Sequence, residues 1–196
     1  MKILTTLGES PPCKRDPKRV DGHHIPGWMS EVELYWLSQQ AKRHDSIVEV
    51  GSWRGRSSYA LAKNCPGRVI CVDHFNGGDC DKVSVQAGKD VKRDFLRHMK
   101  SFMGKKAFLV EKTSLEAAKM CNERVDMVFI DGSHDYESVR NDILAWLPKT
   151  KVLLCGHDFF YDDVKKAVQS IFGKDAKTGY GGIWYVEVAR GVGKID

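Results

Sequence analysis

The fold is decided by the stretch Ile47-Val-Glu-Val-Gly-Ser-Trp-Arg-Gly-Arg-Ser57, in which a β-branched apolar run enters a glycine-punctuated turn and a helix start. A second apolar run follows and ends at Asp73. Glycines in such a turn let the backbone approach a ligand closely, and the later acid can accept hydrogen bonds from ribose hydroxyls. This order of strand, loop, helix, strand and acid predicts a nucleotide-binding crossover unit.

The glycine loop differs from the loop that binds dinucleotides. Its glycines are Gly51 and Gly55, and Trp53 and Arg54 stand between them, so the third glycine of the dinucleotide pattern is missing. A pyrophosphate needs close approach of the backbone, which bulky side chains oppose. The loop therefore favours a smaller ligand without phosphates.

The composition is typical of one globular domain, with 196 residues, 42% hydrophobic and 29% charged. No apolar run is long enough to cross a bilayer, and the apolar stretch at the N-terminus is too short for a signal peptide. The six cysteines form no CxxC pair and are expected to be free thiols. We therefore expect a cytoplasmic protein without a membrane partner. Nucleic acid is not expected as a partner either, because the net charge of +5 is scattered and no nucleic-acid-binding module is visible.

Apolar periodicity predicts strands that alternate with helices in a single domain over residues 27–196, after an irregular arm at residues 1–26. The expected strands cover residues 47–50, 68–73, 107–111, 126–131, 151–155 and 182–188, the last paired with a short strand near 175–178. The expected helices cover residues 30–43, 57–63, 90–103, 114–121, 139–146 and 164–172. Near-continuous apolar strands between helices predict an α/β domain with a parallel sheet covered on both faces.

Acidic residues stand at the predicted carboxyl ends of four strands, namely Glu49, Asp73, Asp131 and Asp158. Ligands of parallel α/β sheets bind beyond these strand ends. We therefore expect the four acids to converge on one edge of the sheet and to form a ligand site there.

Three longer motifs resemble those of the class I S-adenosylmethionine-dependent methyltransferases, in particular a compact O-methyltransferase-like group. They are Glu49-Val-Gly-Ser-Trp-Arg-Gly-Arg-Ser57-Ser58, Phe129-Ile-Asp131-Gly-Ser-His134-Asp-Tyr136-Glu-Ser-Val139-Arg-Asn-Asp142-Ile-Leu-Ala-Trp146-Leu-Pro148 and Gly156-His157-Asp158. The resemblance extends in order over residues 27–190. It implies a Rossmann-like fold, with a mostly parallel central sheet, helices on both faces and an antiparallel C-terminal strand. It also implies S-adenosylmethionine as cofactor and O-methylation of a small molecule or sugar.

The resemblance implies a set of cofactor contacts, in which the loop passes around the methionine part. Glu49 would hold its amino group, directly or through water, Asp73 would bind the ribose hydroxyls, and Ser114 would lie near the adenine. Ser114 could also be the N-cap of its helix. The full set is Glu49, Gly51, Ser52, Gly55, Ser57, Asp73, His74, Ser114 and Asp131.

A second set of residues, after the fourth and fifth strands, is implied to carry the chemistry. Asp131, His157 and Asp158 would hold a divalent metal, Mg²⁺ or Mn²⁺, and Asp131 and His134 would be catalytic. His157 stands where the related enzymes have a carboxylate or amide, and an imidazole favours Mn²⁺, Fe²⁺ or Zn²⁺ over Mg²⁺. Alternatively, His157 points away and waters complete the shell. His134 would be the general base for the acceptor hydroxyl, or else a structural histidine.

Two other functions fit parts of the pattern. A nicotinamide-dependent oxidoreductase would share the sheet and the ribose acid, and Tyr161 and Lys165 have the Tyr-x-x-x-Lys spacing of such enzymes, but the third glycine and the serine are missing. A non-catalytic cofactor-binding or interaction protein on the same scaffold is the main alternative. The joint presence of Asp131, His134 and Asp158 weighs against it.

The walls of the acceptor site and the assembly follow from the resemblance alone. Related enzymes build those walls from the N-terminal arm and from the loop after the second strand, here about residues 75–90. His23, His24, Trp28 and Asp79 are the candidates for this lining. A homodimer is expected on the same grounds.

Overall fold

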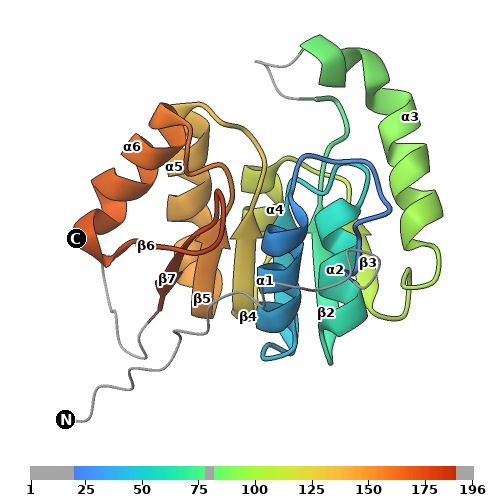
Figure 1. The fold of residues 1–196 in the computed structure, drawn as a ribbon, viewed down its shortest axis with the longest axis horizontal. Coiled ribbons are helices and arrows are strands. Elements are labelled where there is room, and N and C mark those ends of the chain that lie inside the picture. The colour runs from blue at the N-terminus through green and yellow to red at the C-terminus, as the bar shows by residue number, and fades with distance from the viewer. Residues whose placement is uncertain (1–19, 78–81, 189–196) are drawn as a thin grey trace.

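A computed structural model describes residues 20–77 and 82–188 of the chain. Its centre is a seven-stranded sheet with the order β3-β2-β1-β4-β5-β7-β6 (Figure 1). Strands β1 to β5 pair in parallel, whereas β7 is antiparallel to both β5 and β6. The strands are β1 (Ser46–Val50), β2 (Arg68–Val72), β3 (Ala107–Val110), β4 (Val125–Ile130), β5 (Thr150–Gly156), β6 (Lys177–Thr178) and β7 (Trp184–Glu187). The predicted Rossmann-like sheet with an antiparallel C-terminal strand is confirmed.

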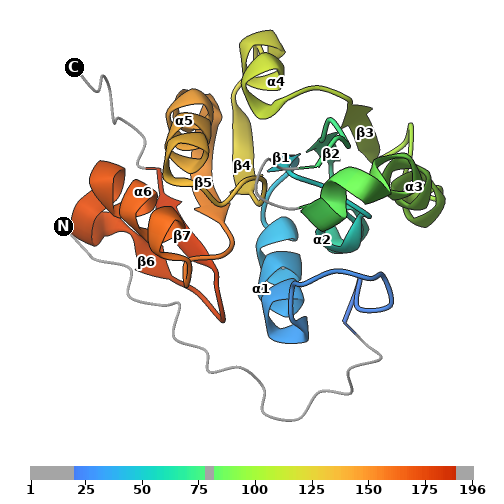
Figure 2. The same cartoon turned by 90° about the horizontal axis from the view of Figure 1, so that it is seen from above.

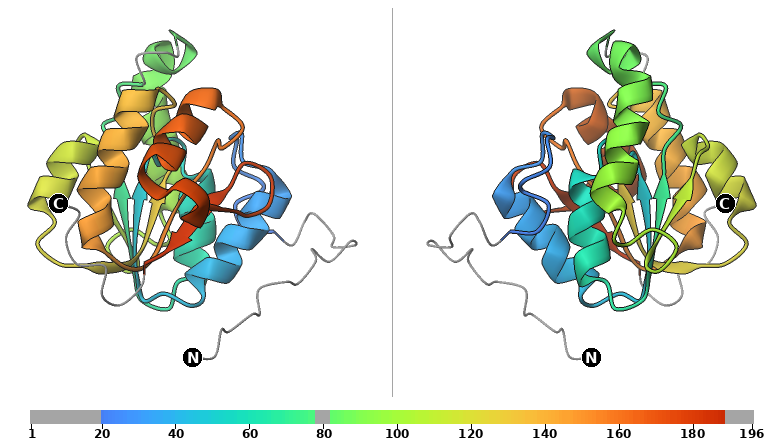
Figure 3. Two further views of the ribbon diagram at one scale, coloured as in Figure 1. Left: turned by 90° about the vertical axis from the view of Figure 1, so that its left-hand side faces the viewer. Right: turned by 90° about the vertical axis from the view of Figure 1, so that its right-hand side faces the viewer.

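Helices cover both faces of this sheet, as predicted. One face carries α1 (Glu31–Ala41), α2 (Arg56–Asn64) and α3 (Lys82–Met99), and the other carries α4 (Ser114–Met120), α5 (Tyr136–Trp146) and α6 (Asp162–Phe172). Figure 2 shows α1 and α2 on one side of the sheet and α4 and α5 on the other, and Figure 3 shows the layers from both ends of the sheet. Within the described ranges, no helix has the length and apolar character needed to span a bilayer.

The strands are apolar on both faces because each face packs against a helical layer. Side chains alternate between two buried clusters, so that Ile47 and Phe129 pack with α1, α2 and α3, while Val48 and Ile130 pack with α4, α5 and α6. A sheet buried on both sides leaves its strand ends as the place where a ligand can reach the backbone.

The largest difference from the predicted elements is the helix after β2. Helix α3 begins at Lys82, well before the predicted start at residue 90, and ends at Met99 rather than near 103. The described apolar residues on its inner face, Val91, Phe95 and Met99, are buried in the core. The prediction uses the helical spacing of apolar residues only over 90–103, so the predicted start lies too late.

The part of the predicted irregular arm that the structure describes is packed against α2. Residues 20–26 form turns, and Ile25 is fully buried. The guanidinium of Arg56 donates hydrogen bonds to the carbonyl oxygens of His23 and Ile25. These backbone acceptors fix the end of the arm to α2, while the first 19 residues lie outside the described ranges.

Candidate active site

The strand ends bring three of the four predicted acids to one edge of the sheet. Asp73 and Asp131 directly follow β2 and β4, and Asp158 lies two residues after β5. Pairing continues just past the strands, because the Asp131 amide donates to the Val50 carbonyl at 2.8 Å and the His157 amide donates to the Ile130 carbonyl at 3.1 Å. The residues that follow β1, β4 and β5 are therefore held side by side.

The fourth acid, Glu49, lies behind this edge but near enough for the charge of Asp131 to act on its carboxylate, so its part in a ligand site stays a prediction. Glu49 lies one residue inside β1, and its fully buried side chain points toward the face that carries α2. One carboxylate oxygen accepts hydrogen bonds from the hydroxyls of Ser52, at 2.7 Å, and Ser58. Burial raises the pKa of Glu49 to about 7, although the hydroxyls of Ser57, Ser58 and Ser52 oppose the shift. Glu49 therefore stabilises the glycine loop by accepting hydrogen bonds from Ser52 in the loop and Ser58 in α2.

The loop after β1 is pressed against the end of β4. Gly51 has a φ of 85°, and a Cβ at this position would lie 2.1 Å from the carbonyl oxygen of Asp131. Gly55, with a φ of 89°, leads into α2. Ser52 and Ser57 are buried and face Glu49. The predicted loop residues Gly51, Ser52, Gly55 and Ser57 are thus brought together between Glu49 and the end of β4.

Asp73 is held by the backbone of two segments. Its Oδ2 accepts the Trp53 amide at 2.7 Å and its Oδ1 accepts the Phe75 amide at 2.7 Å. Each carboxylate oxygen keeps lone pairs for further donors, so the group can bind hydroxyls in a fixed orientation. The neighbouring His74 ring faces its own loop, because its Nδ1 accepts the Asn76 amide at 3.0 Å.

Ser114 is the first residue of α4, and the suggestion that it is the N-cap is wrong. Thr113 is the N-cap, and its hydroxyl accepts the Glu116 amide. The Ser114 hydroxyl instead accepts the Trp146 indole N–H at 2.9 Å. It also hydrogen-bonds Asp142, whose pKa burial raises to about 6. Ser114 therefore connects α4 with α5, and its contact with an adenine stays a prediction.

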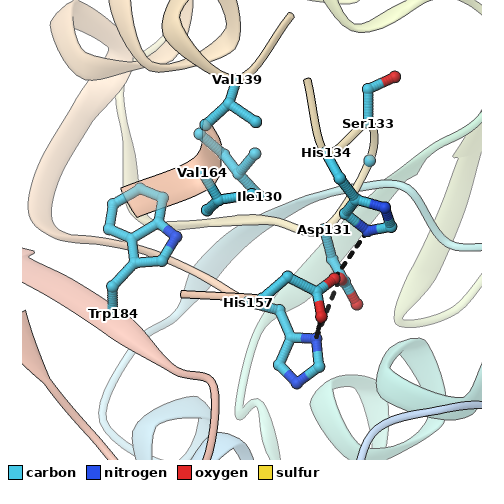
Figure 4. Close-up of a pocket in the computed structure, with 10 residues that line it drawn as sticks. Ile130, Asp131, Ser133, His134, Val139, His157, Val164 and Trp184 are labelled. Carbon is cyan, nitrogen blue, oxygen red and sulfur yellow. Dashed lines mark ion pairs between the residues drawn. The ribbon is translucent and has the colours of Figure 1, made fainter. Parts of the chain in front are cut away.

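Asp131, His134 and Asp158 form the chemically richest group at the strand ends. Their ligand atoms all lie within 4.8 Å of one another, a spacing that can hold a metal ion. His134 Nε2 is 2.7 Å from Asp158 Oδ2, and this hydrogen bond raises the pKa of His134. The Tyr161 ring stacks on the His134 ring, with centroids 5.2 Å apart. His134 is about half exposed, with its ring oriented by Asp158 (Figure 4).

His157 lies beneath this group rather than on its open side. Its Nδ1 is 3.2 Å from Asp158 Oδ1 and 3.4 Å from Asp131 Oδ1, while its Nε2 is 3.1 Å from Glu33 Oε1. Burial alone would lower the pKa of His157, but the three carboxylates outweigh it and raise the pKa to about 12. Burial would raise the pKa of Asp158. Its contacts with His134 and His157 outweigh burial and hold this pKa well below its usual range. The surrounding carboxylates therefore favour the protonated form of the His157 ring.

A small pocket with a cavity volume of about 10 Å³ opens on these residues. Figure 4 shows its polar wall, with Asp131, His134 and His157, and an apolar wall across from them. The apolar wall is formed by Ile130, Val139, Val164 and Trp184. Phe160 and Tyr161 follow Asp158 and are exposed, with ring centroids 4.8 Å apart. The pocket combines polar groups suited to a hydroxyl with apolar and aromatic surface.

The candidates for the acceptor lining are distributed unevenly. The Trp28 side chain is 72% exposed and packs against Trp53 in the glycine loop, with centroids 4.3 Å apart. His23 contacts His24, which packs on Tyr59 of α2. Asp79 lies outside the described residues. Trp28 is thus the described candidate that touches the loop.

Sequence reasoning missed Glu33 as a residue of this site. In the structure Glu33 forms a capping box with Ser30 at the start of α1, and its Oε2 accepts the Ser30 amide at 2.6 Å. The other oxygen contacts His157, and it accepts the Gly182 amide at 2.7 Å. No local pattern signals those long-range contacts.

Several solved structures of methyltransferases resemble this fold at low sequence identity. The O-methyltransferase from Bacillus cereus, solved in complex with SAH, is 14% identical with a TM-score of 0.59, over 84% of each chain. TomG from Streptomyces achromogenes, an O-methyltransferase solved with SAM, is 13% identical with a TM-score of 0.60, over 83% of this chain and 82% of that one. The SAH-bound methyltransferase PaMTH1 from Podospora anserina is 11% identical with a TM-score of 0.59, over 80% of this chain and 78% of that one. These likenesses show a shared fold.

The family assignment rests on the sequence match. No curated protein matches the sequence significantly. A family model described as a methyltransferase domain matches residues 48–159, which is more than half of the chain and runs from β1 to the loop after β5. This span contains the glycine loop, Asp73 and the group around Asp131 and Asp158. The chain belongs to the family of methyltransferase domains.

Proposed function

We propose that this protein transfers a methyl group from S-adenosylmethionine to a hydroxyl group of a small molecule. The observation that carries the proposal is the pairing of two sites on one sheet edge. Asp73 and the glycine loop form a site for a nucleoside, and Asp131, His134 and Asp158 form an acid–base site beside it. The TomG and Bacillus cereus structures, which share the fold, hold SAM and SAH respectively.

The cofactor half of the proposal rests on Asp73 and the loop. The Asp73 carboxylate is oriented by two backbone amides, so its remaining lone pairs can accept both ribose hydroxyls. Gly51 allows the loop to lie directly against the Asp131 carbonyl, and Gly55 allows it to turn into α2 beside Phe95 and Met99, so the two glycines fix the path of the loop around the proposed place of the methionine part. Glu49 stabilises the loop through Ser52 and Ser58, and its second oxygen has no hydrogen-bond partner among the described residues. That oxygen is available to the amino group, through water or after a small loop movement.

His134 is the proposed general base. Its Nε2 faces Asp158, which orients the ring and stabilises its protonated form, while the ring remains about half exposed toward the pocket. A positioned imidazole can accept the proton of an acceptor hydroxyl as the oxygen attacks the methyl carbon. The sulfonium already activates that carbon, so the protein mainly aligns the oxygen and removes its proton.

The donor set also fits a divalent metal. Asp131 and Asp158 offer carboxylate oxygens, and His157 Nδ1 lies within 3.4 Å of both. Glu33 on the other ring nitrogen of His157 is the kind of partner that metal-ligating histidines have. We therefore propose Asp131, His157 and Asp158 as the metal ligands, where an ion would have to displace the proton that the carboxylates hold on the His157 ring. The imidazole would favour Mn²⁺ over Mg²⁺. When bound, such an ion lowers the pKa of a hydroxyl.

A second ligand set is possible, because His134 also lies within 4.8 Å of the ligand atoms of Asp131 and Asp158. His134 as a ligand could not be the general base at the same time. The two assignments differ in the effect of substitution. Loss of Mn²⁺ binding in His157→Asn with retention in His134→Asn supports the first assignment, and the reverse supports the second.

The acceptor is proposed to carry a ring next to its hydroxyl. The exposed Tyr161 ring stacks on His134, the exposed Phe160 ring packs against Tyr161, and Ile130 and Val139 form part of the apolar side of the pocket. Aromatic and apolar walls around a few polar groups are typical of small-molecule sites. Either an aromatic ring or the C–H face of a sugar could stack there, so both classes belong in an acceptor screen.

The first test is calorimetric titration with SAH, with NAD as the control ligand. Micromolar binding of SAH without binding of NAD supports the cofactor half. A separate heat for Mn²⁺ that disappears in Asp158→Ala supports the metal assignment. If SAH fails to bind with and without metal, the proposal is wrong and a non-catalytic role of this scaffold takes its place.

A further inference from the structure

Glu33 connects three segments that are distant in the sequence. From the first turn of α1, one of its oxygens accepts the Ser30 amide and hydroxyl, each at 2.6 Å. The other oxygen accepts the Gly182 amide at 2.7 Å, across 149 positions of the chain, and lies 3.1 Å from His157 Nε2. The side chain is buried, so the carboxylate has exchanged water for these partners.

His157 passes this restraint on to the acids of the site. Its ring is buried, with Glu33 at one nitrogen and both Asp131 and Asp158 at the other. The contact with Glu33 is an ion pair at 3.1 Å rather than a well-aligned hydrogen bond. Glu33 holds the ring at Nε2, and Asp131 and Asp158 are both attracted to Nδ1, so the position of the ring determines where the two acids come together.

This series of contacts links Glu33 of α1 to His134 at the pocket, although the two residues do not touch. Asp158 lies between the two histidines, with one oxygen on His157 and the other on His134. A change in the position of the His157 ring therefore alters the orientation of Asp158, and Asp158 orients His134. Partners of this kind behind a histidine are known to tune ligand orientation and affinity.

We propose that Glu33 is a positioning residue of the active site, which acts through His157 to hold Asp131 and Asp158 at their working separation. A role in catalysis rests on the proposed function, whereas the coupling from Glu33 to His134 rests on the contacts alone. Glu33 contacts neither the pocket nor His134 in the described structure, so its effect on His134 must pass through His157 and Asp158.

The test uses full-length protein with ¹⁵N-labelled histidine and compares the ring signals of wild type, Glu33→Gln and Glu31→Gln at one pH. The His134 and His157 signals are assigned from the spectra of His134→Asn and His157→Asn. Glu31 is the matched control, since it lies in the same helical turn and its removal changes the charge equally. We expect Glu33→Gln to shift the signals of His157 and also those of His134, and Glu31→Gln to leave both unchanged.

The idea fails if Glu33→Gln leaves the His134 signals where they are in wild type, or if Glu31→Gln shifts them as much. Should Glu33→Gln not fold, Glu33→Asp decides the question, because it keeps the charge but shortens the reach to His157. Its expected result is a smaller shift of both rings, and an unchanged His134 overturns the proposal.

Metal and cofactor titrations of the same samples separate this proposal from the proposed function. Glu33→Gln is expected to bind Mn²⁺ about 10–100-fold more weakly than wild type, as is typical for loss of a carboxylate behind a ligating histidine, while SAH affinity is retained. Absence of SAH binding in wild type contradicts the proposed function, but the ring signals still decide the role of Glu33. SAH binding together with unshifted His134 signals contradicts the positioning role alone.

Discussion

The two halves of the candidate site are held in place by different means. In the cofactor half, main-chain groups hold the site in place, since the Trp53 and Phe75 amides orient Asp73 and glycines shape the loop. In the acceptor half, side chains hold other side chains, through the ion pairs of His134 and His157 with Asp158. The first half is therefore expected to tolerate changes elsewhere in the molecule, and the second to respond to distant residues such as Glu33.

The largest effect on stability is expected at Gly51, where the glycine loop of the cofactor half packs against Asp131 of the acceptor half. Gly51→Ala would place a Cβ 2.1 Å from the Asp131 carbonyl oxygen at a φ of 85°. We expect it to lower the free energy of unfolding by about 3 kcal/mol or more, measured by urea denaturation. Gly104→Ala is the control, since its φ is also positive at 71° but no atom lies within 4 Å of the added Cβ. A loss of only about 1–2 kcal/mol in both variants would show that the close packing of the two halves is unimportant.

A substitution of His134 should separate the halves by function. His134→Ala is expected to lower kcat by about 10²–10⁴-fold, the usual contribution of a general base. The affinity for SAH should stay near that of wild type, because His134 is absent from the contacts of Asp73 and the glycine loop. Steady-state kinetics with an acceptor found by screening phenols and sugars measures the first quantity, and calorimetry the second. Near-full turnover by the variant would remove His134 from the base role.

The pH dependence of stability tests the buried position of Glu49 behind the glycine loop. Its pKa in the folded protein is about 7 against an ordinary value of 4.5, so between these pH values the folded state holds a proton that the unfolded chain has released. Stability of wild type relative to Glu49→Gln should therefore fall as the pH rises from 4.5 to 7 and level off above that. The full change is on the order of 3 kcal/mol. Thermal or urea unfolding across this pH range measures the stability of both proteins. A stability difference that does not change with pH would mean that the pKa of Glu49 is not raised in the folded protein.

Asp73→Asn should weaken the cofactor half alone. The amide keeps one oxygen but loses the charge that strengthens hydrogen bonds to hydroxyls, so we expect SAH to bind about 10–100-fold more weakly. The His134 ring signals should be unchanged, because the ion pair with Asp158 is not involved. An unaltered calorimetric affinity would place the ribose elsewhere.

Trp28→Ala is expected to have the smallest effect. Its ring is 72% exposed and touches the glycine loop only through Trp53. The loss of unfolding free energy should be about 1 kcal/mol or less, as for an exposed aromatic pair. A large change in acceptor KM with unchanged SAH affinity would instead identify Trp28 as part of the acceptor wall.

The sequence by itself determined the order of strands and helices, the glycine loop and the acids at three strand ends. These features are local: apolar runs, glycines and an acid after a strand are read within about 30 residues of one crossover unit. Asp73 and Gly51 could be predicted for that reason, as could the antiparallel closing strand once the resemblance was recognised. The short sequence motif around Asp131 and His134 likewise placed both residues correctly at the end of β4.

Only the tertiary structure decided where Glu49 and His157 point and what Glu33 does. Glu49 turns inward because side chains alternate along a strand, so one residue before the end of β1 belongs to the covered face. His157 faces Glu33 because the first turn of α1, on the face that also carries α2 and α3, lies against the residues after β5 and before β7, which brings together groups more than a hundred positions apart. Local patterns carry no information on such contacts, since they depend on how the layers pack and not on the residues beside each position.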